Sequence, residues 1–278
     1  MKNLWNPKEA KAMANDPLAL RVYTSRLLGR NPNLVMHGGG NTSLKTRGRN
    51  FYGQEEYVLY IKGSGWDLAT IEAAGFAAVK MEALLRMAEM PNLTDTDMVR
   101  EQRAAMIDPN APNPSVEAIL HAIIPYRYVD HSHADAVVTI TNTPEGHKRI
   151  KEIYGPRILI VPYVMPGFVL ARKVYEMARG INWTDYDGMV LLNHGLFTFA
   201  NSPQESYENH IRLVTKAEEY IKKYVKPSFM PFAPKLESSK ILLSLAKLRH
   251  SISRIQGGAV LALFKDDARS MAFSKREV

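Results

Sequence analysis

Cysteine is absent from the whole chain of 278 residues. This absence excludes disulfides, thiol nucleophiles and zinc or iron–sulfur sites with cysteine ligands, and it agrees with a reducing compartment. Long apolar runs are also missing, because no segment reaches the roughly 18 apolar residues that a membrane span needs. The first residues, MKNLWNPKEAKAM, lack the apolar core of a signal peptide. We therefore expect a soluble, cytoplasmic protein without a membrane partner.

Signatures of nucleic-acid binding are missing too, although the chain carries a formal net charge of +8. Most of the positive excess belongs to the tail, because 235–278 holds nine Lys or Arg against four Asp or Glu. Basic residues do not alternate with aromatic ones, and no zinc-finger spacing occurs. We interpret the charge as solvated surface with a minor benefit for anionic substrates, and we expect no nucleic-acid partner.

The sequence does contain alternating helical and strand-like segments, which predict a mixed α/β body. Several strand-like segments are rich in Val, Ile and Leu, as expected for a central sheet covered by helices. We expect strands at 57–62, 129–141, 158–164 and 189–200. Helical patterns lie near 7–28, 69–90, 95–107, 115–124, 144–153, 168–179 and 203–224.

The composition changes after the last of these helices. The segment VKPSFMPFAPKLESSK contains Pro227, Pro231 and Pro234, which is typical of a linker or an extended arm. Beyond it, ILLSLAKLRHSI is amphipathic, and AVLALF could form a strand. We therefore expect a main domain at 1–225 and a C-terminal extension at 226–278, consisting of a Pro-rich linker and a basic helical tail.

Three histidines form a candidate metal site. His131 and His133 stand two positions apart in the strand-like run YVDHSHADAVVTI, so both side chains point to one face of an extended strand. His194 ends another apolar run, directly before a glycine. Three protein ligands leave a coordination position open, as in catalytic zinc sites. An H-x-H pair also arises by chance, and an isolated buried histidine is often a hydrogen-bonded core residue.

Two glycine-rich segments precede these histidines. The first, MHGGGNTSLK, leads into Asn41 and Ser43, and the second, YIKGSGWDL, places Gly63, Ser64 and Gly65 after a strand. Backbone N–H groups in such loops can converge on an anion. Neither segment matches a dinucleotide or Walker A fingerprint, and either one alone could be a tight turn. Beside a candidate metal site, they favour a substrate that carries phosphate or hydroxyl groups.

Glu117 is the candidate acid–base residue. In NPSVEAILHAI, Ser115 can cap a helix and place Glu117 in the first turn, where the helix dipole favours a carboxylate. Acidic residues are common there for capping reasons alone. His121 lies four residues further on the same helical face, either as a supporting partner of Glu117 or as an ordinary packing residue.

The motifs GGGNTS, KGSG, PSVE, HSH and NHG occur in an order that resembles the class II aldolase/adducin family. The resemblance covers roughly residues 15–225, and it is strongest to the aldolase half of bifunctional rhamnulose-1-phosphate aldolase/short-chain dehydrogenase proteins. It implies an α/β fold with three layers, in which helices cover a central, mostly antiparallel sheet and a C-terminal extension follows.

The resemblance also implies a role for each matching residue. His131, His133 and His194 match the zinc ligands, and Glu117 matches the catalytic glutamate, which can also ligate the metal when substrate is absent. Substrate binding would fall to the glycine-loop and serine positions, namely Asn41, Ser43, Gly63, Ser64, Gly65 and Ser115. Simpler aldolases of the family have two serines before the glutamate, whereas here Val116 follows Ser115.

The activity implied is that of a zinc-dependent aldolase that cleaves a ketose 1-phosphate, similar to rhamnulose 1-phosphate, through a metal-stabilised enediolate. Another divalent metal could replace Zn²⁺. Family alternatives are a sugar-phosphate epimerase, a sugar-acid decarboxylase and a non-catalytic, adducin-like scaffold. The partner would be a small sugar or sugar phosphate, and relatives lead us to expect a homo-oligomer, such as a tetramer.

Overall fold

The computed structural model describes residues 1–50, 52–224, 238–264, 267 and 270–271, with the backbone alone for 238–240. The chain forms two units, Met1–Tyr224 and Val225–Val278. Among the residues described, no helix combines the length and the apolar character needed to cross a membrane.

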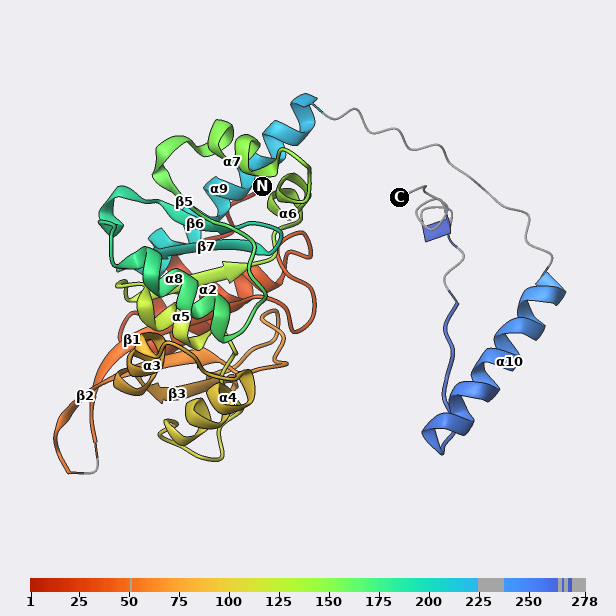
Figure 1. The fold of residues 1–278 in the computed structure, drawn as a ribbon, viewed down its shortest axis with the longest axis horizontal. Helices are drawn as coiled ribbons and strands as arrows, with labels where there is room; N and C mark the ends of the chain where they lie inside the picture. Colours follow the sequence, from red (N-terminus) through yellow and green to blue (C-terminus); the bar gives the residue numbers. More distant parts are fainter. Residues whose placement is uncertain (51, 225–237, 265–266, 268–269, 272–278) are drawn as a thin grey trace. The chain divides into compact units, whose positions relative to one another are not determined.

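A seven-stranded sheet runs through the first unit in the order β3-β2-β1-β4-β7-β6-β5 (Figure 1). Neighbouring strands are antiparallel except for β5 and β6, which are parallel. The mostly antiparallel sheet expected from the family resemblance is therefore confirmed. The strands are β1 (Asn41–Arg49), β2 (Glu55–Lys62), β3 (Phe76–Lys80), β4 (Tyr128–Ser132), β5 (Ile158–Val161), β6 (Gly188–Leu191) and β7 (Gly195–Ala200).

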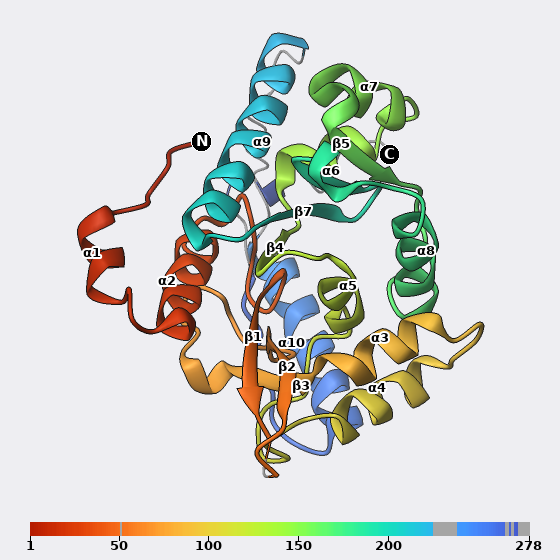
Figure 2. The ribbon, with the colours of Figure 1, turned by 90° about the vertical axis from the view of Figure 1, so that its left-hand side faces the viewer.

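Helices cover both faces of this sheet and complete the three layers (Figure 2). One apolar cluster joins the sheet to α3 (Met81–Glu89), α4 (Asp95–Ala104), α5 (Ala118–Ile123) and α8 (Phe168–Ala178). A second cluster joins the other face to α2 (Pro17–Gly29), α6 (Asp135–Thr141), α7 (Gly146–Tyr154) and α9 (Pro203–Tyr224). The remaining elements are α1 (Pro7–Ala12), η1 (Ala73–Gly75), η2 (Gly155–Arg157) and η3 (Trp183–Asp185).

The strand directions bring several chain segments to one edge of the sheet. Because β1 is antiparallel to both β2 and β4, the start of β1 lies beside the ends of β2 and β4. The turn between β6 and β7 reaches the same edge, since β7 is antiparallel to β4. Residues far apart in the sequence therefore meet at this edge, and the candidate site is built there.

The predicted strand at 129–141 is wrong in its second half. β4 ends at Ser132, and α6 begins at Asp135. The run VVTIT has β-branched side chains that favour a strand, but in α6 they pack against α9 as an apolar helical face. Tertiary packing therefore overrides the local preference.

Other element boundaries differ for local reasons. The predicted helix at 7–28 is two helices, because the Asp16 side chain caps the N-terminus of α2 and Pro17 opens it. The predicted helix at 69–90 holds η1 and β3 before α3 begins. The predicted strand at 189–200 is a hairpin of β6 and β7. β1 was not expected, because its sequence NTSLKTRGR is largely polar.

In the second unit, the amphipathic segment lies within α10 (Ser238–Gln256). The segment 259–264, which could have formed a strand, is neither helix nor strand. The three linker prolines lie outside the described residues.

Candidate metal centre

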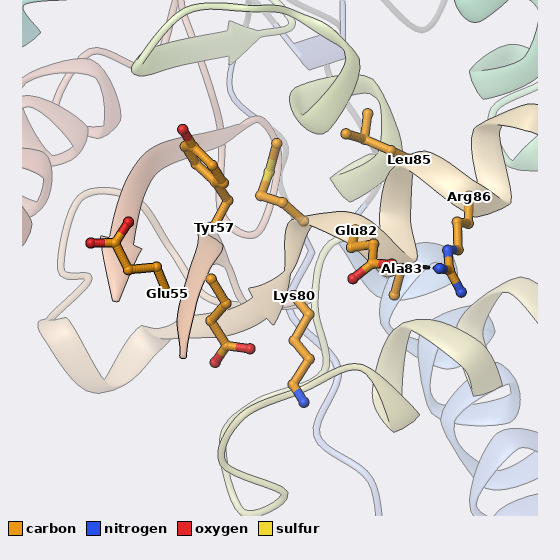
Figure 3. A pocket seen from close by; sticks show the side chains of 9 residues that line it. Glu55, Tyr57, Lys80, Glu82, Ala83, Leu85 and Arg86 are labelled. Atoms are coloured by element: carbon orange, nitrogen blue, oxygen red, sulfur yellow. Dashed lines mark ion pairs between the residues drawn. The ribbon is translucent and has the colours of Figure 1, made fainter. Parts of the chain in front are cut away.

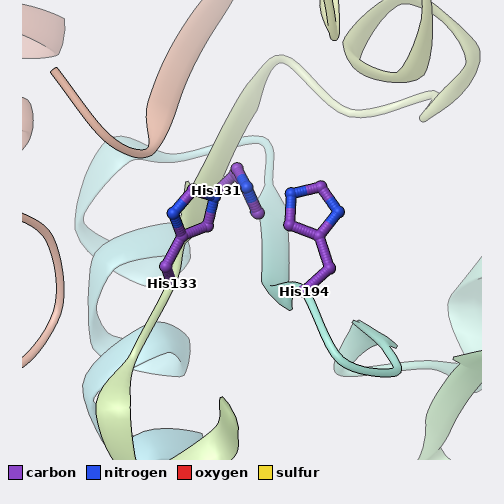
Figure 4. Close-up of side chains that lie close together, drawn as sticks. All are labelled: His131, His133 and His194. Atoms are coloured by element: carbon purple, nitrogen blue, oxygen red, sulfur yellow. The ribbon is translucent and has the colours of Figure 1, made fainter. Parts of the chain in front are cut away.

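The three candidate ligands form a compact triangle at the ends of their strands (Figure 4). The ring centroids of His131 lie 4.9 Å from His133 and 5.1 Å from His194, and those of His133 and His194 lie 5.1 Å apart. Each ring offers one nitrogen, and these nitrogens all lie within 4.8 Å of one another. This arrangement suits a single ion held by three imidazoles.

The contacts of His131 define which of its nitrogens can bind. Nδ1 lies 3.1 Å from the carbonyl oxygen of Leu196, and a carbonyl only accepts hydrogen bonds, so Nδ1 carries the proton. Nε2 is buried and has no hydrogen-bond partner in the described part of the chain. The ring stacks on Phe197, with centroids 4.2 Å apart. In a histidine ligand, one ring nitrogen usually donates a hydrogen bond that fixes the ring, and the other presents its lone pair to the metal.

The protonation states agree with ligand binding. Burial lowers the pKa of His131 well below its usual value, and the nearby His194 and His133 lower it further. The pKa values of His133 and His194 are also lowered, mainly by burial, although Glu117 opposes the shift at His194. The rings are therefore neutral near pH 7, as a metal requires.

His194 is positioned by a tight turn between β6 and β7. Asn193 adopts a positive φ of 59°, a region that asparagine tolerates, and the His194 amide donates to the Leu191 carbonyl at 3.2 Å. Gly195 follows, and a Cβ there would lie 2.4 Å from the Ser132 carbonyl oxygen. The hairpin can approach β4 this closely only with glycine at that position.

Glu117 faces the histidine triangle. It is the N-cap residue of α5 rather than a first-turn residue, and Ser115 accepts from its amide at 3.3 Å. Its Oε2 lies 3.4 Å from His131 Nε2, and its Oε1 lies 3.5 Å from His194 Nε2. Oε1 has no hydrogen-bond partner among the described residues. Burial raises the pKa of Glu117, against the opposing influence of His194, Asn41 and Lys62.

Asn41 holds the second oxygen of Glu117. The first residue of β1, it pairs directly with His131 across the sheet, so both side chains point to the same face. Its Nδ2 donates to Glu117 Oε2 at 2.6 Å and to Ser115 Oγ at 3.1 Å. Ser43, on the same face of β1, is fully buried and bonds to His121, so it lies behind Asn41.

The KGSG segment forms a loop beside these groups. The Ser64 amide donates to the Asn113 carbonyl at 2.8 Å, and Gly63 forms an isolated bridge with Pro114. Ser64 and Gly65 are exposed. A Cβ at Gly38 would lie 3.3 Å from the Cα of Gly65, so the two glycine-rich loops touch. The predicted substrate-binding positions are thus neighbours, and their contacts with a substrate stay a prediction.

Lys62 was not singled out by the sequence, although it begins the KGSG motif. It is the last residue of β2 and only 2% exposed, and its Nζ donates to the carbonyls of Gly38 at 2.9 Å and Gly63 at 3.5 Å. Burial lowers its pKa to about 8, while Asp67 and Glu117 act in the opposite direction. A cation therefore ties the two glycine-rich loops together beside the site. A lone lysine at a strand end carries no sequence signal of burial.

The opposite face of β4 carries a buried polar network. Asp130 accepts from Arg21 and from Ser206 at 2.5 Å each, and both members of the Arg21–Asp130 ion pair are fully buried. Next to it, His210 lies between the hydroxyls of Ser132 and Thr198, at 2.6 and 2.9 Å. These contacts hold β4 on the face opposite to the site, while the side chain of His131 points to the site.

A groove of about 700 Å³ lies away from this site, at the opposite end of β2 (Figure 3). It is lined by the start of β2, the end of β3 and the first residues of α3. Lys80 and the exposed Glu82–Arg86 ion pair belong to it. None of the predicted site residues lines it.

Residues 19–221 match the family model of the class II aldolase and adducin N-terminal domain. The chain belongs to the class II aldolase/adducin family. Its seven-stranded sheet between two helical layers is the fold of that family, and the resemblance based on the five motifs is confirmed at the family level.

Similar proteins extend this result. The structure of the N-terminal class II aldolase domain of a conserved Thermoplasma acidophilum protein is 41% identical, with a TM-score of 0.73, and the match covers 80% of this chain and 99% of that one. A Thermotoga maritima sugar-phosphate aldolase structure, 16% identical with a TM-score of 0.54, covers 78% and 99% and shares the fold. YuxG of Bacillus subtilis (strain 168), described as an uncharacterized oxidoreductase, is 36% identical over 222 residues. The match covers 80% of this chain but only 32% of YuxG.

Proposed function

We propose that this chain is a zinc-dependent aldolase that cleaves a ketose 1-phosphate, similar to rhamnulose 1-phosphate, into a triose phosphate and an aldehyde. The observation that carries the proposal is the position of Glu117, whose Oε1 has no hydrogen-bond partner among the described residues and faces the triangle of His131, His133 and His194. Membership of the class II aldolase/adducin family supports the reaction class. We further propose a cytoplasmic homo-oligomer with its catalytic domain at 1–225.

The donor set fits zinc. Three neutral imidazoles suit Zn²⁺, and Nε2 of His131, which has no hydrogen-bond partner in the part of the chain that the structure describes, is the nitrogen that a metal would use. When bound, a divalent cation supplies Lewis-acid stabilisation of the negative charge that develops on the substrate oxygens. With three protein ligands, coordination positions remain for those oxygens.

Glu117 would transfer the proton at the carbon where the C3–C4 bond breaks. Burial raises its pKa, which makes the neutral acid more accessible near pH 7, while the hydrogen bond from Asn41 and the charge of Lys62 keep the carboxylate accessible as well. A group whose two forms are both accessible can give and take a proton. Asn41 would hold Oε2 while Oε1 acts on the substrate.

The phosphate would bind where the two glycine-rich loops meet. Lys62 supplies a positive charge there, and Ser64, Gly65 and Ser115 supply nearby polar groups. With a pKa of about 8, the Lys62 ammonium is mostly protonated at neutral pH. Its charge would offset the loss of the second serine, which is Val116 in this chain.

The central test combines metal analysis with a retro-aldol assay. We expect His131→Ala to lose bound zinc and activity, and Glu117→Gln to keep zinc while kcat falls by about 10²–10⁴-fold. His147→Ala, an exposed histidine on α7, is the matched control and should behave as wild type. Full activity in either site variant would refute the mechanism. Products of unchanged mass would instead indicate an epimerase, and release of CO₂ would indicate a decarboxylase.

The phosphate assignment has a separate test. Lys62→Met should lower kcat/KM for a phosphorylated ketose by about 10-fold or more, as expected for the loss of a charge-assisted contact, and should change that for the unphosphorylated ketose much less. Lys80→Met, which changes a lysine at the distant groove, is the control. Equal losses on both substrates would show that Lys62 has no role in phosphate selection.

A further inference from the structure

His121 is a buried histidine behind the site that connects to Glu117 through Asn41. It lies on α5, is fully buried, and contacts two residues of β1. Its Nδ1 lies 2.8 Å from Ser43 Oγ, and its Nε2 lies 2.5 Å from Asn41 Oδ1. Its ring also meets Phe197 edge-on, with centroids 5.3 Å apart, so the imidazole is held on several sides.

Ser43, His121, Asn41 and Glu117 form a row of hydrogen bonds, and the contact between Asn41 and Glu117 determines the direction of the others. Nδ2 of Asn41 lies 2.6 Å from Oε2 of Glu117, and an amide nitrogen only donates hydrogen bonds, so Asn41 is the donor of this contact. Oδ1 of Asn41 then faces His121, and because an amide oxygen only accepts hydrogen bonds, Nε2 of His121 must carry the proton and donate to it. Nδ1 of His121 is left without a proton and accepts from the Ser43 hydroxyl. All donors therefore point toward Glu117.

The surroundings of His121 keep its ring neutral. Burial lowers its pKa well below the usual value, and the positive charges of Lys45 and Arg21 lower it further. A neutral imidazole carries one N–H, so donation from Nε2 excludes donation from Nδ1. Aligned hydrogen bonds in a buried network strengthen one another, and an unmade one is costly there.

We propose that His121 is a positioning residue, which orients the Asn41 amide so that Nδ2 holds Oε2 of Glu117 and Oε1 faces the histidine triangle. Its role in turnover rests on the proposed aldolase function, whereas its tautomer does not. Without the Nε2–H donor, Oδ1 of Asn41 would lose its hydrogen bond, and the amide would be held in this orientation from the side of Glu117 and Ser115 alone. Flipping would place its carbonyl oxygen against the carboxylate of Glu117 and repel it.

The tautomer can be measured directly on the wild-type protein without substrate. In ¹⁵N-labelled histidine spectra at pH 7.5, we expect His121 as the Nε2–H tautomer and His131 as the Nδ1–H tautomer, because their hydrogen-bond partners are reversed. His121→Gln provides the resonance assignment. An Nδ1–H tautomer at His121 would overturn the proposal, whatever the enzyme activity proves to be.

Two isosteric replacements separate positioning from packing. The amide of glutamine reaches the place of Nε2 and can donate to Asn41, whereas asparagine reaches the place of Nδ1 and cannot. We expect His121→Gln to stay within a few-fold of wild-type kcat, and His121→Asn to lose kcat by about 10–100-fold with KM and zinc content unchanged. Equal losses of kcat in the two variants would overturn the proposal.

A double replacement tests whether the effect passes through Asn41. In an Asn41→Ala background, His121→Asn should lower kcat no further, because the amide that it orients is gone. An undiminished additional loss would mean that His121 acts independently of Asn41. If the wild-type protein cleaved no ketose phosphate, the proposed function would fail, while the tautomer measurement would still decide the orientation of this chain.

Discussion

Replacing Asp130 by asparagine would test how much the buried ion pair between Asp130 and Arg21 stabilises the fold. The Asp130 carboxylate accepts from Arg21 and Ser206 at 2.5 Å each, and the Arg21–Asp130 pair has no solvent exposure. Asparagine keeps the size of the side chain but removes its charge. The Arg21 guanidinium would remain buried without a counter-charge.

The size of the effect follows from this burial. Removing one partner of a buried ion pair typically costs about 3–5 kcal/mol, because the other charge stays desolvated. In a unit of this size, each kcal/mol lowers the melting temperature by about 2–4 °C, so the expected decrease is about 6–20 °C. The double variant Arg21→Met, Asp130→Asn should lose less than the sum of the two single losses, since no unpaired charge remains.

Urea unfolding followed by tryptophan fluorescence measures the free energy of unfolding of each variant. The matched control is Glu82→Gln, which breaks the Glu82–Arg86 pair, whose side chains are 75% and 77% exposed. This exposed pair should contribute less than about 1 kcal/mol. If Asp130→Asn lost no more free energy of unfolding than Glu82→Gln, the reasoning on the buried pair would be refuted.

Further predictions concern the close packing and the titration of the same region. Gly195→Ala should lower the free energy of unfolding by more than about 2 kcal/mol and weaken zinc binding in calorimetry, because its Cβ would lie 2.4 Å from Ser132 O and 2.9 Å from His131 Cε1. Gly180→Ala, with nothing within 4 Å, should stay within about 1 kcal/mol, and equal losses would contradict the geometry. The pKa of His210 is lowered to about 4, so the unfolded chain binds the extra proton between pH 6.5 and 4. The free energy of unfolding should therefore fall by about 3 kcal/mol from this residue as pH drops through that window. His210→Asn should remove this part of the pH dependence, and an unchanged slope in urea titrations would contradict it.

The sequence predicts the parts of the site that depend on local pattern. The glycine-rich loops, the start of a helix near Glu117 and the spacing of His131 and His133 can each be recognised from a few consecutive residues. Even so, His133 lies just past the last residue of β4, so strand alternation alone does not account for its position. The position of His194 depends on the hairpin turn between β6 and β7. The sequence predicts a continuous strand at 189–200 instead, so it does not predict this turn.

The remaining parts depend on pairing between distant segments. No local pattern shows that Asn41 pairs with His131, since the register joins strands about 90 residues apart in the chain. The Nζ of the buried Lys62 donates to the carbonyl of Gly38, which lies 24 residues away in the chain, so this contact has no local sequence signal. The role of His121 depends on its contacts with β1, which sequence spacing along α5 could not show.

β4 carries His131 on the face of the site and Asp130 on the opposite face. The pairing register of this strand therefore affects both the site and the buried ion pair. A shift of one residue in its pairing would turn His131 toward Arg21 and α9, and would turn Asp130 into the site. The misregistered chain would then lose one of the three candidate metal ligands and leave Arg21 buried without its counter-charge in a single step. Competing arrangements of this sheet are thus destabilised twice, so a chain in which the three histidines come together has already paired its central strand correctly.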